Sequence, residues 1–110
     1  MGIFDFLKMP RAGADINEAV RSLRGKSGAW LIDVREADEY SAGHIPGSIN
    51  LPVSTIGTAE LPFTDKEAEL YVYCLMGTRS ARAVRALRSR GYTNVRNIGG
   101  INAWRGPIER

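Results

Sequence analysis

The sequence predicts an α/β fold built on a mainly parallel sheet. From residue 16 to residue 104, segments with helical periodicity alternate with short segments rich in apolar and β-branched residues. The two most apolar segments, residues 29–34 and 70–74, are continuous runs. Continuous runs are typical of parallel strands that are covered on both faces, and strands that alternate with helices indicate crossover connections. A chain of 110 residues corresponds to one domain.

Residues 1–14 are predicted to be an N-terminal extension, and residues 15–110 form the domain. The extension carries Ile3, Phe4, Phe6 and Leu7. It is therefore either a short amphipathic turn that docks on the body or on a partner, or a loosely held terminus.

The first half of the domain reads as helix, strand, helix, strand. Asp15 and Glu18 resemble a capping box, and the helical spacing that follows predicts a helix over residues 16–24 closed by Gly25. Residues 29–34 predict a buried strand, residues 35–41 a short helix and residues 48–51 a short strand. Residues 53–65 have the weakest pattern, and Thr64 with Glu67 either caps one helical turn or lies in a loop.

The second half continues the alternation as strand, helix, strand, helix. A strand over residues 70–74 precedes a helix over residues 80–90, whose core face is Ala83, Val84, Ala86 and Leu87 and whose arginines at 82, 85 and 88 face solvent. Residues 94–98 alternate, as a strand near the sheet edge does. Gly99-Gly100 is expected to turn the chain into a short final helix at residues 101–104, with Trp104 buried.

Composition excludes several kinds of site. One cysteine cannot form an intramolecular disulfide, and with a single histidine it cannot complete a structural zinc site. The net charge of +3, without a lysine-rich run, favours small anions as partners and argues against nucleic acid. No apolar run reaches the length of a membrane span, and the first ten residues lack the features of a secretory signal, so we expect a cytoplasmic protein.

Cys74 lies between the strand at 70–74 and the helix that follows, with a short loop containing Gly77 in between. This arrangement directs several backbone N–H groups at one point, at the positive end of a helix dipole. A thiol there has a lowered pKa and reacts as a nucleophile. The alternative is an inert buried thiol that packs like a small hydrophobe.

Four segments together resemble a single rhodanese domain. They are LIDVRE (31–36), GHIPGSINLP (43–52), YCLMGTRS (73–80), and GYTNV (91–95) running on to GGINAW (99–104). They occur in the family's order and cover about residues 15–108. The resemblance implies a three-layer rhodanese-like fold with a parallel sheet of four or five strands flanked by helices on both faces. It also implies a sulfurtransferase whose Cys74 forms a persulfide.

The resemblance, read with the loop chemistry, gives each site residue an expected role. Cys74 is the catalytic nucleophile, and the substrate-binding loop consists of Leu75, Met76, Gly77, Thr78 and Arg79. Four residues separate Cys74 from Arg79, whereas the related phosphatase loop has five, so the narrower loop favours sulfur over phosphate. Arg79 either donates to an oxyanion or braces the loop through an ion pair, and both roles are compatible.

Residues around the loop are expected to support it. Asp33 and Arg35 end the neighbouring strand and are expected to brace the site more than to touch substrate. Ser80 is expected to be the N-cap of the helix, and His44 to have a structural role. Leu75 and Met76 place apolar side chains at the mouth of the site, where they either shield a persulfide or receive an apolar acceptor.

We therefore expect sulfur transfer by double displacement without a metal or organic cofactor. The donor is thiosulfate or a persulfide, and the acceptor is cyanide, a small thiol or a protein thiol. A second hypothesis is a non-turnover persulfide carrier or docking module that serves a partner protein. A third is phosphatase or arsenate reductase activity, against which the loop length argues.

Overall fold

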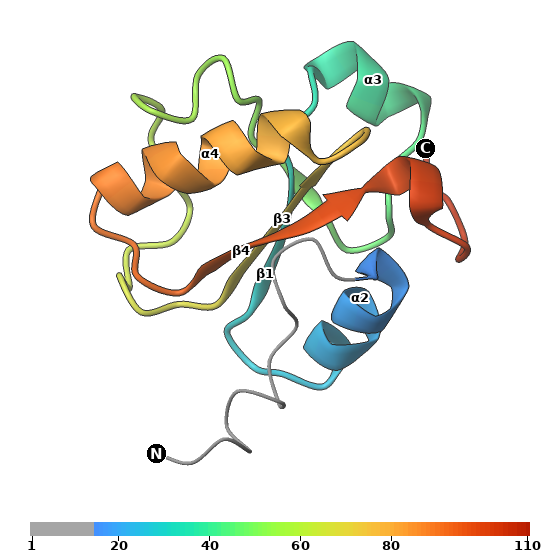
Figure 1. Ribbon diagram of the computed structural model, residues 1–110, viewed down its shortest axis with the longest axis horizontal. Helices are drawn as coiled ribbons and strands as arrows, with labels where there is room; N and C mark the ends of the chain where they lie inside the picture. Colours follow the sequence, from blue (N-terminus) through green and yellow to red (C-terminus); the bar gives the residue numbers. More distant parts are fainter. Residues whose placement is uncertain (1–14) are drawn as a thin grey trace.

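The computed structural model describes residues 15–110, so the expected N-terminal extension lies outside the described residues. The elements are α2 (Ile16–Arg24), β1 (Trp30–Asp33), α3 (Ala37–Ala42), β2 (Ile49–Asn50), β3 (Leu70–Cys74), α4 (Thr78–Ser89), β4 (Val95–Gly100) and the 3-10 helix η1 (Ile101–Ala103). The four strands pair in parallel in the order β2-β1-β3-β4. The predicted α/β class with a parallel sheet is confirmed, and Figure 1 shows α2 and α4 on opposite sides of the sheet.

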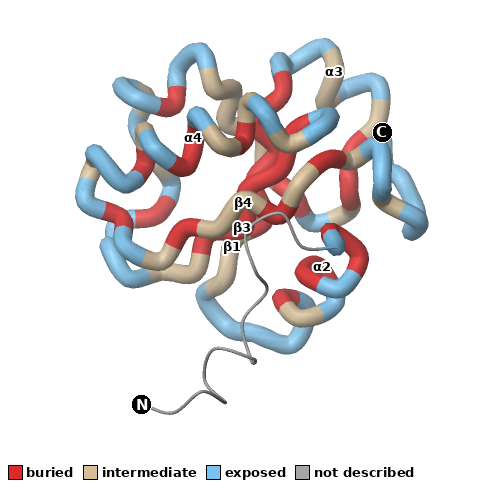
Figure 2. The backbone as a smooth tube through the Cα atoms, in the orientation of Figure 1, coloured by how far each residue is buried: buried red, intermediate tan, exposed pale blue. Residues whose placement is uncertain are grey.

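Two hydrophobic cores hold the three layers together. One lies between the sheet and α4 and includes Ile32, Val72 and Leu87. The other lies between the sheet and α2 and includes Ile16 and Tyr71. Every residue of β3 is buried, because this central strand is covered on both faces (Figure 2). β3 therefore fixes the position of whatever follows its carboxyl end.

The first helix has the predicted bounds, but its cap differs in detail. The Asp15 carboxylate accepts the Asn17 N–H at 2.9 Å, and Gly25 is the C-cap. The expected partner Glu18 is exposed. A reciprocal capping box occurs instead at α3, between Glu36 and Glu39. Thr64 and Glu67 lie in irregular and turn structure, and the Glu67 N–H donates to the Asp65 carboxylate, so no helix forms there.

Helix α4 begins two residues earlier than predicted. Its N-cap is Gly77, whose φ of 100° is left-handed, and Ser80 lies in the first turn. The prediction of Ser80 as N-cap is therefore wrong: a serine there matches the usual cap type, but its hydroxyl bonds within the site below. The helix instead starts at the glycine that turns the loop.

Strand β4 is longer than predicted and contains an irregularity. It pairs with β3 through Gly99 and Gly100, and its register shifts so that Val72 faces Asn97 while Tyr73 faces Gly99. Gly99, with a φ of 100°, absorbs the shift, so the turn expected at Gly99-Gly100 falls at η1. As expected, β4 is an edge strand. Trp104 is only partly buried, against the core beneath α2.

No helix within residues 15–110 is long and apolar enough to cross a membrane.

Candidate active site

Cys74 is the last residue of the central strand and lies directly before the α4 loop. Cys74 is buried, with 1% of its surface exposed. The sulfur atom Sγ accepts the Gly77 N–H at 3.0 Å and the Ser80 N–H at 3.3 Å, and it lies 3.4 Å from Ser80 Oγ. The chain thus folds back on the sulfur and surrounds it with donors from the first turn of a helix.

Opposing effects set the protonation of this thiol. Burial alone raises the pKa of Cys74, but the hydroxyl and N–H of Ser80 and the N–H groups of Gly77 and Met76 lower it more, so the pKa of Cys74 lies below its ordinary value. The thiol is buried because Cys74 ends a strand that is covered on both faces. The hydrogen bonds distinguish this thiol from an inert one, because they stabilise the anion.

The loop around the sulfur is held tightly against β4. The Asn102 N–H donates to the Leu75 carbonyl at 3.2 Å. A Cβ added at Gly100 would collide with that same carbonyl, so the strand can approach the loop this closely only with glycine. The end of β4 and the start of η1 therefore hold the Leu75 backbone in place.

Arg79 makes a bidentate ion pair with Glu39 of α3. The two N–O distances are 2.6 and 3.0 Å, and both side chains are about one-third exposed. The hydrogen bonds from Arg79 lower the pKa of Glu39 to about 2. No local pattern could indicate Glu39 as the partner of Arg79, since the two residues lie 40 positions apart. The expected bracing ion pair of Arg79 is present, with its partner now identified.

Asn97 is a second residue that the sequence patterns did not single out. Its Oδ1 accepts the Ser80 hydroxyl at 2.7 Å and the Gly99 N–H at 2.9 Å, while its Nδ2 donates to the Gly77 carbonyl at 3.0 Å. A polar residue in an alternating edge strand gives no signal of such contacts. Asn97 joins β4 to both the loop and the first turn of α4.

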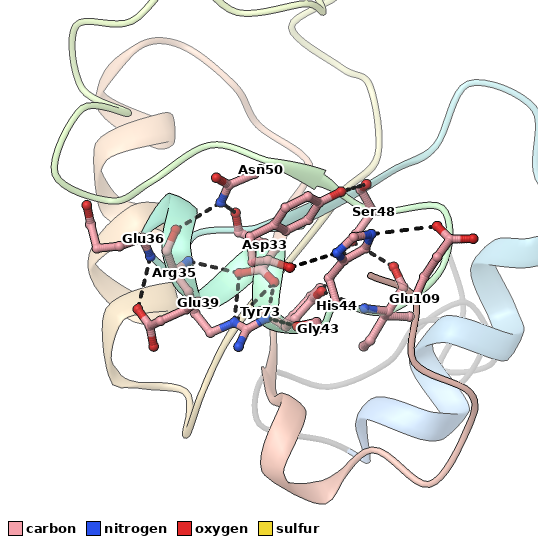
Figure 3. A network of polar contacts seen from close by, with 12 residues as sticks. Asp33, Arg35, Glu36, Glu39, Gly43, His44, Ser48, Asn50, Tyr73 and Glu109 are labelled. Carbon is pink, nitrogen blue, oxygen red and sulfur yellow. Dashed lines mark hydrogen bonds and ion pairs between the residues drawn. The ribbon is translucent and has the colours of Figure 1, made fainter.

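Asp33 and Arg35 form a buried brace at the carboxyl end of β1 (Figure 3). Arg35 donates to Asp33 at 2.7 Å and to the Gly43 carbonyl at 2.7 Å, and the Asp33 side chain is fully buried. Burial lowers the pKa of Arg35, but the hydrogen bond and the charge of Asp33 together raise it by more. The pKa of Arg35 therefore lies above its ordinary value. Asn50 donates to the carbonyls of Asp33 and Arg35. These contacts are those of a brace.

His44 belongs to a separate contact group. Its ring stacks on Tyr40 with centroids 3.8 Å apart, Nδ1 lies 2.8 Å from the Tyr40 carbonyl, and Nε2 lies 3.6 Å from the Glu109 carboxylate. His44 and Glu109 also pair through their backbones, which holds the C-terminal segment against α3 (Figure 3). These contacts agree with the expected structural role.

The mouth of the site is a small open cavity of about 180 Å³. The cavity is lined by Cys74, Leu75, Met76, Thr78 and Arg79. Leu75 and Met76 are 42% and 72% exposed, although both are large apolar residues. The structure thus brings four of the five predicted loop residues together with Cys74 at one opening, and the fifth, Gly77, donates its N–H to the sulfur. Within residues 15–110, no group of three or more His, Cys, Asp or Glu could hold a metal ion.

Comparison with known proteins gives consistent matches. The sequence profile of the rhodanese-like domain matches residues 16–107. The chain is 37% identical to the human thiosulfate:glutathione sulfurtransferase over 105 residues, covering 83% of this chain and 89% of that protein. It is 36% identical to the adenylyltransferase and sulfurtransferase uba4 of Ogataea parapolymorpha, covering 86% of this chain but only 25% of that longer protein. The solved structure of the human single-domain sulfurtransferase TSTD1 superposes with a TM-score of 0.67 at 36% identity, covering 76% of this chain and 85% of that one.

Proposed function

Since the chain belongs to the rhodanese-like family, we propose that it transfers sulfane sulfur through a persulfide on Cys74. Thiosulfate or a persulfide is the donor, and cyanide or a thiol, small or protein-borne, is the acceptor. The observation that carries the proposal is the sulfur of Cys74 at the end of β3, held by N–H groups of Gly77 and Ser80 at 3.0 and 3.3 Å. Donors in this arrangement stabilise a thiolate and equally a persulfide anion.

The first half-reaction loads the cysteine. The Cys74 thiolate attacks the outer sulfur of thiosulfate, a new S–S bond forms, and the old S–S bond breaks so that sulfite leaves with its electron pair. With a persulfide donor, the leaving group is a thiolate. The N–H groups of Thr78 and Arg79 precede the first intrahelical bond, from the Ala81 N–H to the Gly77 carbonyl. A helix offers N–H groups at these positions to an anion, here the outer sulfur or the departing oxyanion.

The second half-reaction removes the outer sulfur from Cys74. The acceptor, cyanide or a thiolate, attacks the outer sulfur of the Cys74 persulfide and takes it, and the electron pair of the broken S–S bond returns to Cys74 as thiolate. The Arg79 cation at the cavity favours the anionic forms of Cys74 in both steps. This cycle needs only Cys74 and the groups around it.

Mass spectrometry after treatment with thiosulfate tests the loading step. Wild-type protein should gain one sulfur atom, and Cys74→Ser should gain none. A matched control places a thiol on the surface, as Ser54→Cys in the Cys74→Ser background, because Ser54 is exposed and lies in a separate loop. That control should acquire at most a trace of persulfide. Equal labelling of wild type and Cys74→Ser would refute the proposal, and a panel of persulfide donors read out in the same way would identify the preferred one.

A second candidate is a persulfide carrier that serves a partner protein. The exposed Leu75 and Met76 at the mouth favour it, because apolar side chains around an anionic site suit a protein surface better than a small hydrated anion. Steady-state turnover with thiosulfate and cyanide separates the candidates: a transferase turns over, whereas a carrier loads once and turns over poorly. Phosphatase activity is the weakest alternative, and a generic aryl phosphate assay would detect it.

A further inference from the structure

The hydroxyl of Ser80 has one hydrogen but three possible hydrogen-bond acceptors. Its oxygen lies 2.7 Å from Asn97 Oδ1, 3.0 Å from the Gly77 carbonyl and 3.4 Å from Cys74 Sγ. Ser80 is fully buried, so solvent does not supply another partner. The single O–H hydrogen can be directed to only one of the three groups at a time.

The Asn97 amide is oriented by its own bonds. Oδ1 accepts the Gly99 N–H at 2.9 Å, and Nδ2 donates to the Gly77 carbonyl at 3.0 Å. Oδ1 is therefore the atom that faces Ser80, and it can only accept. The shortest of the three contacts is thus an O–H donated by Ser80 to Asn97.

We propose that Asn97 is a positioning residue that holds the Ser80 hydroxyl hydrogen away from the sulfur of Cys74 until that sulfur becomes an anion. In the thiol form, the Sγ–H donates to Ser80 Oγ, and Ser80 donates to Asn97. When the thiol proton leaves to solvent, the hydroxyl rotates about its Cβ–Oγ bond and donates to the thiolate, giving up Asn97. The inference rests on the proposed function, because it describes how the nucleophile of that reaction is set.

Two sets of bonds then act on Cys74 in opposite directions. The N–H groups of Gly77 and Ser80 favour the anion, whereas Asn97 favours the thiol by competing for the one hydroxyl that could join them. The Gly77 carbonyl is the weaker competitor, since it already accepts from Asn97 Nδ2 and from the Ala81 N–H. Asn97 therefore restrains the reactivity of the sulfur.

Among the described residues 15–110, the charged groups linked to Cys74 come from three elements. Arg79 of α4 interacts with the thiolate, Glu39 of α3 pairs with Arg79, and Asp33 at the end of β1 also acts on Arg79. The substitutions below leave all three unchanged. A shift in the thiol pKa can then be assigned to the Ser80 hydroxyl and residue 97.

The test measures the thiol pKa from the pH dependence of alkylation by iodoacetamide. Cys74 is the only cysteine, so the full chain reports on this site alone. Asn97→Ala should lower the pKa by roughly half a unit to one unit, the range of one hydrogen bond, and Asn97→Asp should raise it. In a Ser80→Ala background, Asn97→Ala should have no effect.

A purely structural role for Asn97 predicts the opposite sign. Loosening the loop would move the Gly77 N–H away from the sulfur, and Asn97→Ala would then raise the pKa with or without the Ser80 hydroxyl. A raised pKa in Asn97→Ala, or an effect of Asn97→Ala that persists in the Ser80→Ala background, would overturn the proposal. Alkylation needs no sulfur transfer, so a failure to form persulfide would refute the proposed function and leave this measurement decisive.

Infrared spectroscopy of the wild-type S–H stretch covers the case in which the Asn97 variants do not fold. At a pH well below the thiol pKa, the band should lie at lower frequency in wild type than in Ser80→Ala, because only wild type has the Ser80 oxygen as acceptor. Coincident bands in the two folded proteins would also overturn the proposal.

Discussion

At the scale of single residues, the site depends on partners that lie far apart in the chain. Cys74 is buried yet has a lowered pKa because Ser80, Gly77 and Met76 direct donors at its sulfur. Arg79 keeps its charge at the mouth while its guanidinium is fixed by Glu39 of α3. A fixed cation costs less conformational entropy when an anion binds than a free side chain would. Under the proposed function, the ion pair holds the Arg79 cation in place at the opening where an oxyanion would bind.

The Glu39–Arg79 ion pair gives stability a defined pH dependence. The pKa of Glu39 falls from 4.5 to about 2 on folding, so the folded state favours the carboxylate. Its stabilisation is complete above the unfolded value and is lost as the pH falls towards 2. Glu39→Gln should therefore lower the free energy of unfolding by about 1 kcal/mol at neutral pH, with the difference from wild type shrinking below about pH 4.

Urea unfolding of both proteins across this pH range checks the prediction. Glu60→Gln is the matched control, because Glu60 is an exposed glutamate in the loop before β3. It should change stability by less than about 0.5 kcal/mol at every pH. A loss for Glu39→Gln that is the same at low and neutral pH would contradict the assigned ion pair.

At the scale of elements, the start of α4 sets the surroundings of the Cys74 sulfur. Gly77 takes a left-handed conformation, which directs its own N–H at Cys74 and lets the helix begin at Thr78. The helix carries basic residues but none of its first-turn residues is acidic. Its dipole and its composition therefore both favour an anion at the N-terminal end.

The glycines at the two ends of α4 provide a matched pair of substitutions. Gly77 and Gly91 have φ values of 100° and 96°, and a Cβ would meet no atom closer than 3.6 Å at either. Alanine at each should therefore cost about 1–2 kcal/mol of stability from backbone strain alone. Only Gly77→Ala should also raise the pKa of Cys74 and slow its alkylation near neutral pH by roughly 3- to 10-fold, because it displaces the N–H at the sulfur.

Thermal unfolding and iodoacetamide kinetics on the same two proteins separate these effects. Equal stability losses with unequal alkylation rates are expected. If Gly91→Ala slowed alkylation as much as Gly77→Ala, the effect would belong to the stability of α4 and not to the Gly77 N–H.

At the scale of the whole molecule, the sequence predicts the helices and strands whose bounds are set by local patterns. The bounds of α2 and β3 agree with the predictions because periodicity and continuous apolar runs specify them. All of the predicted loop residues except Gly77 line one cavity with Cys74, because Cys74 ends a central strand. The predictions fail where contacts between distant residues determine the structure. Ser80 has the residue type of an N-cap, but its hydroxyl bonds to Asn97, 17 positions away. Glu39 and the irregular pairing of β4 likewise arise only when the layers pack.

The buried brace is the whole-molecule feature with the largest expected effect on stability. Arg35 joins β1 to the end of α3, and Val34 beside it donates to the carbonyl of Tyr73, the residue before Cys74. Arg35→Met keeps the long side chain but leaves the Asp33 carboxylate fully buried without its counter-ion. The expected loss in urea unfolding is about 3–5 kcal/mol.

Lys26→Met is the matched control for this change. It removes an exposed ion pair with Glu69 by the same kind of substitution, and it should cost at most about 1 kcal/mol. The contrast follows from solvation: water replaces the lost partner at Glu69 but cannot reach Asp33. Similar losses in the two variants would mean that the Asp33 carboxylate finds another donor in place of Arg35. The strand ends beside Cys74 would then be held by their backbone bonds and by Asn50, with little contribution from the ion pair.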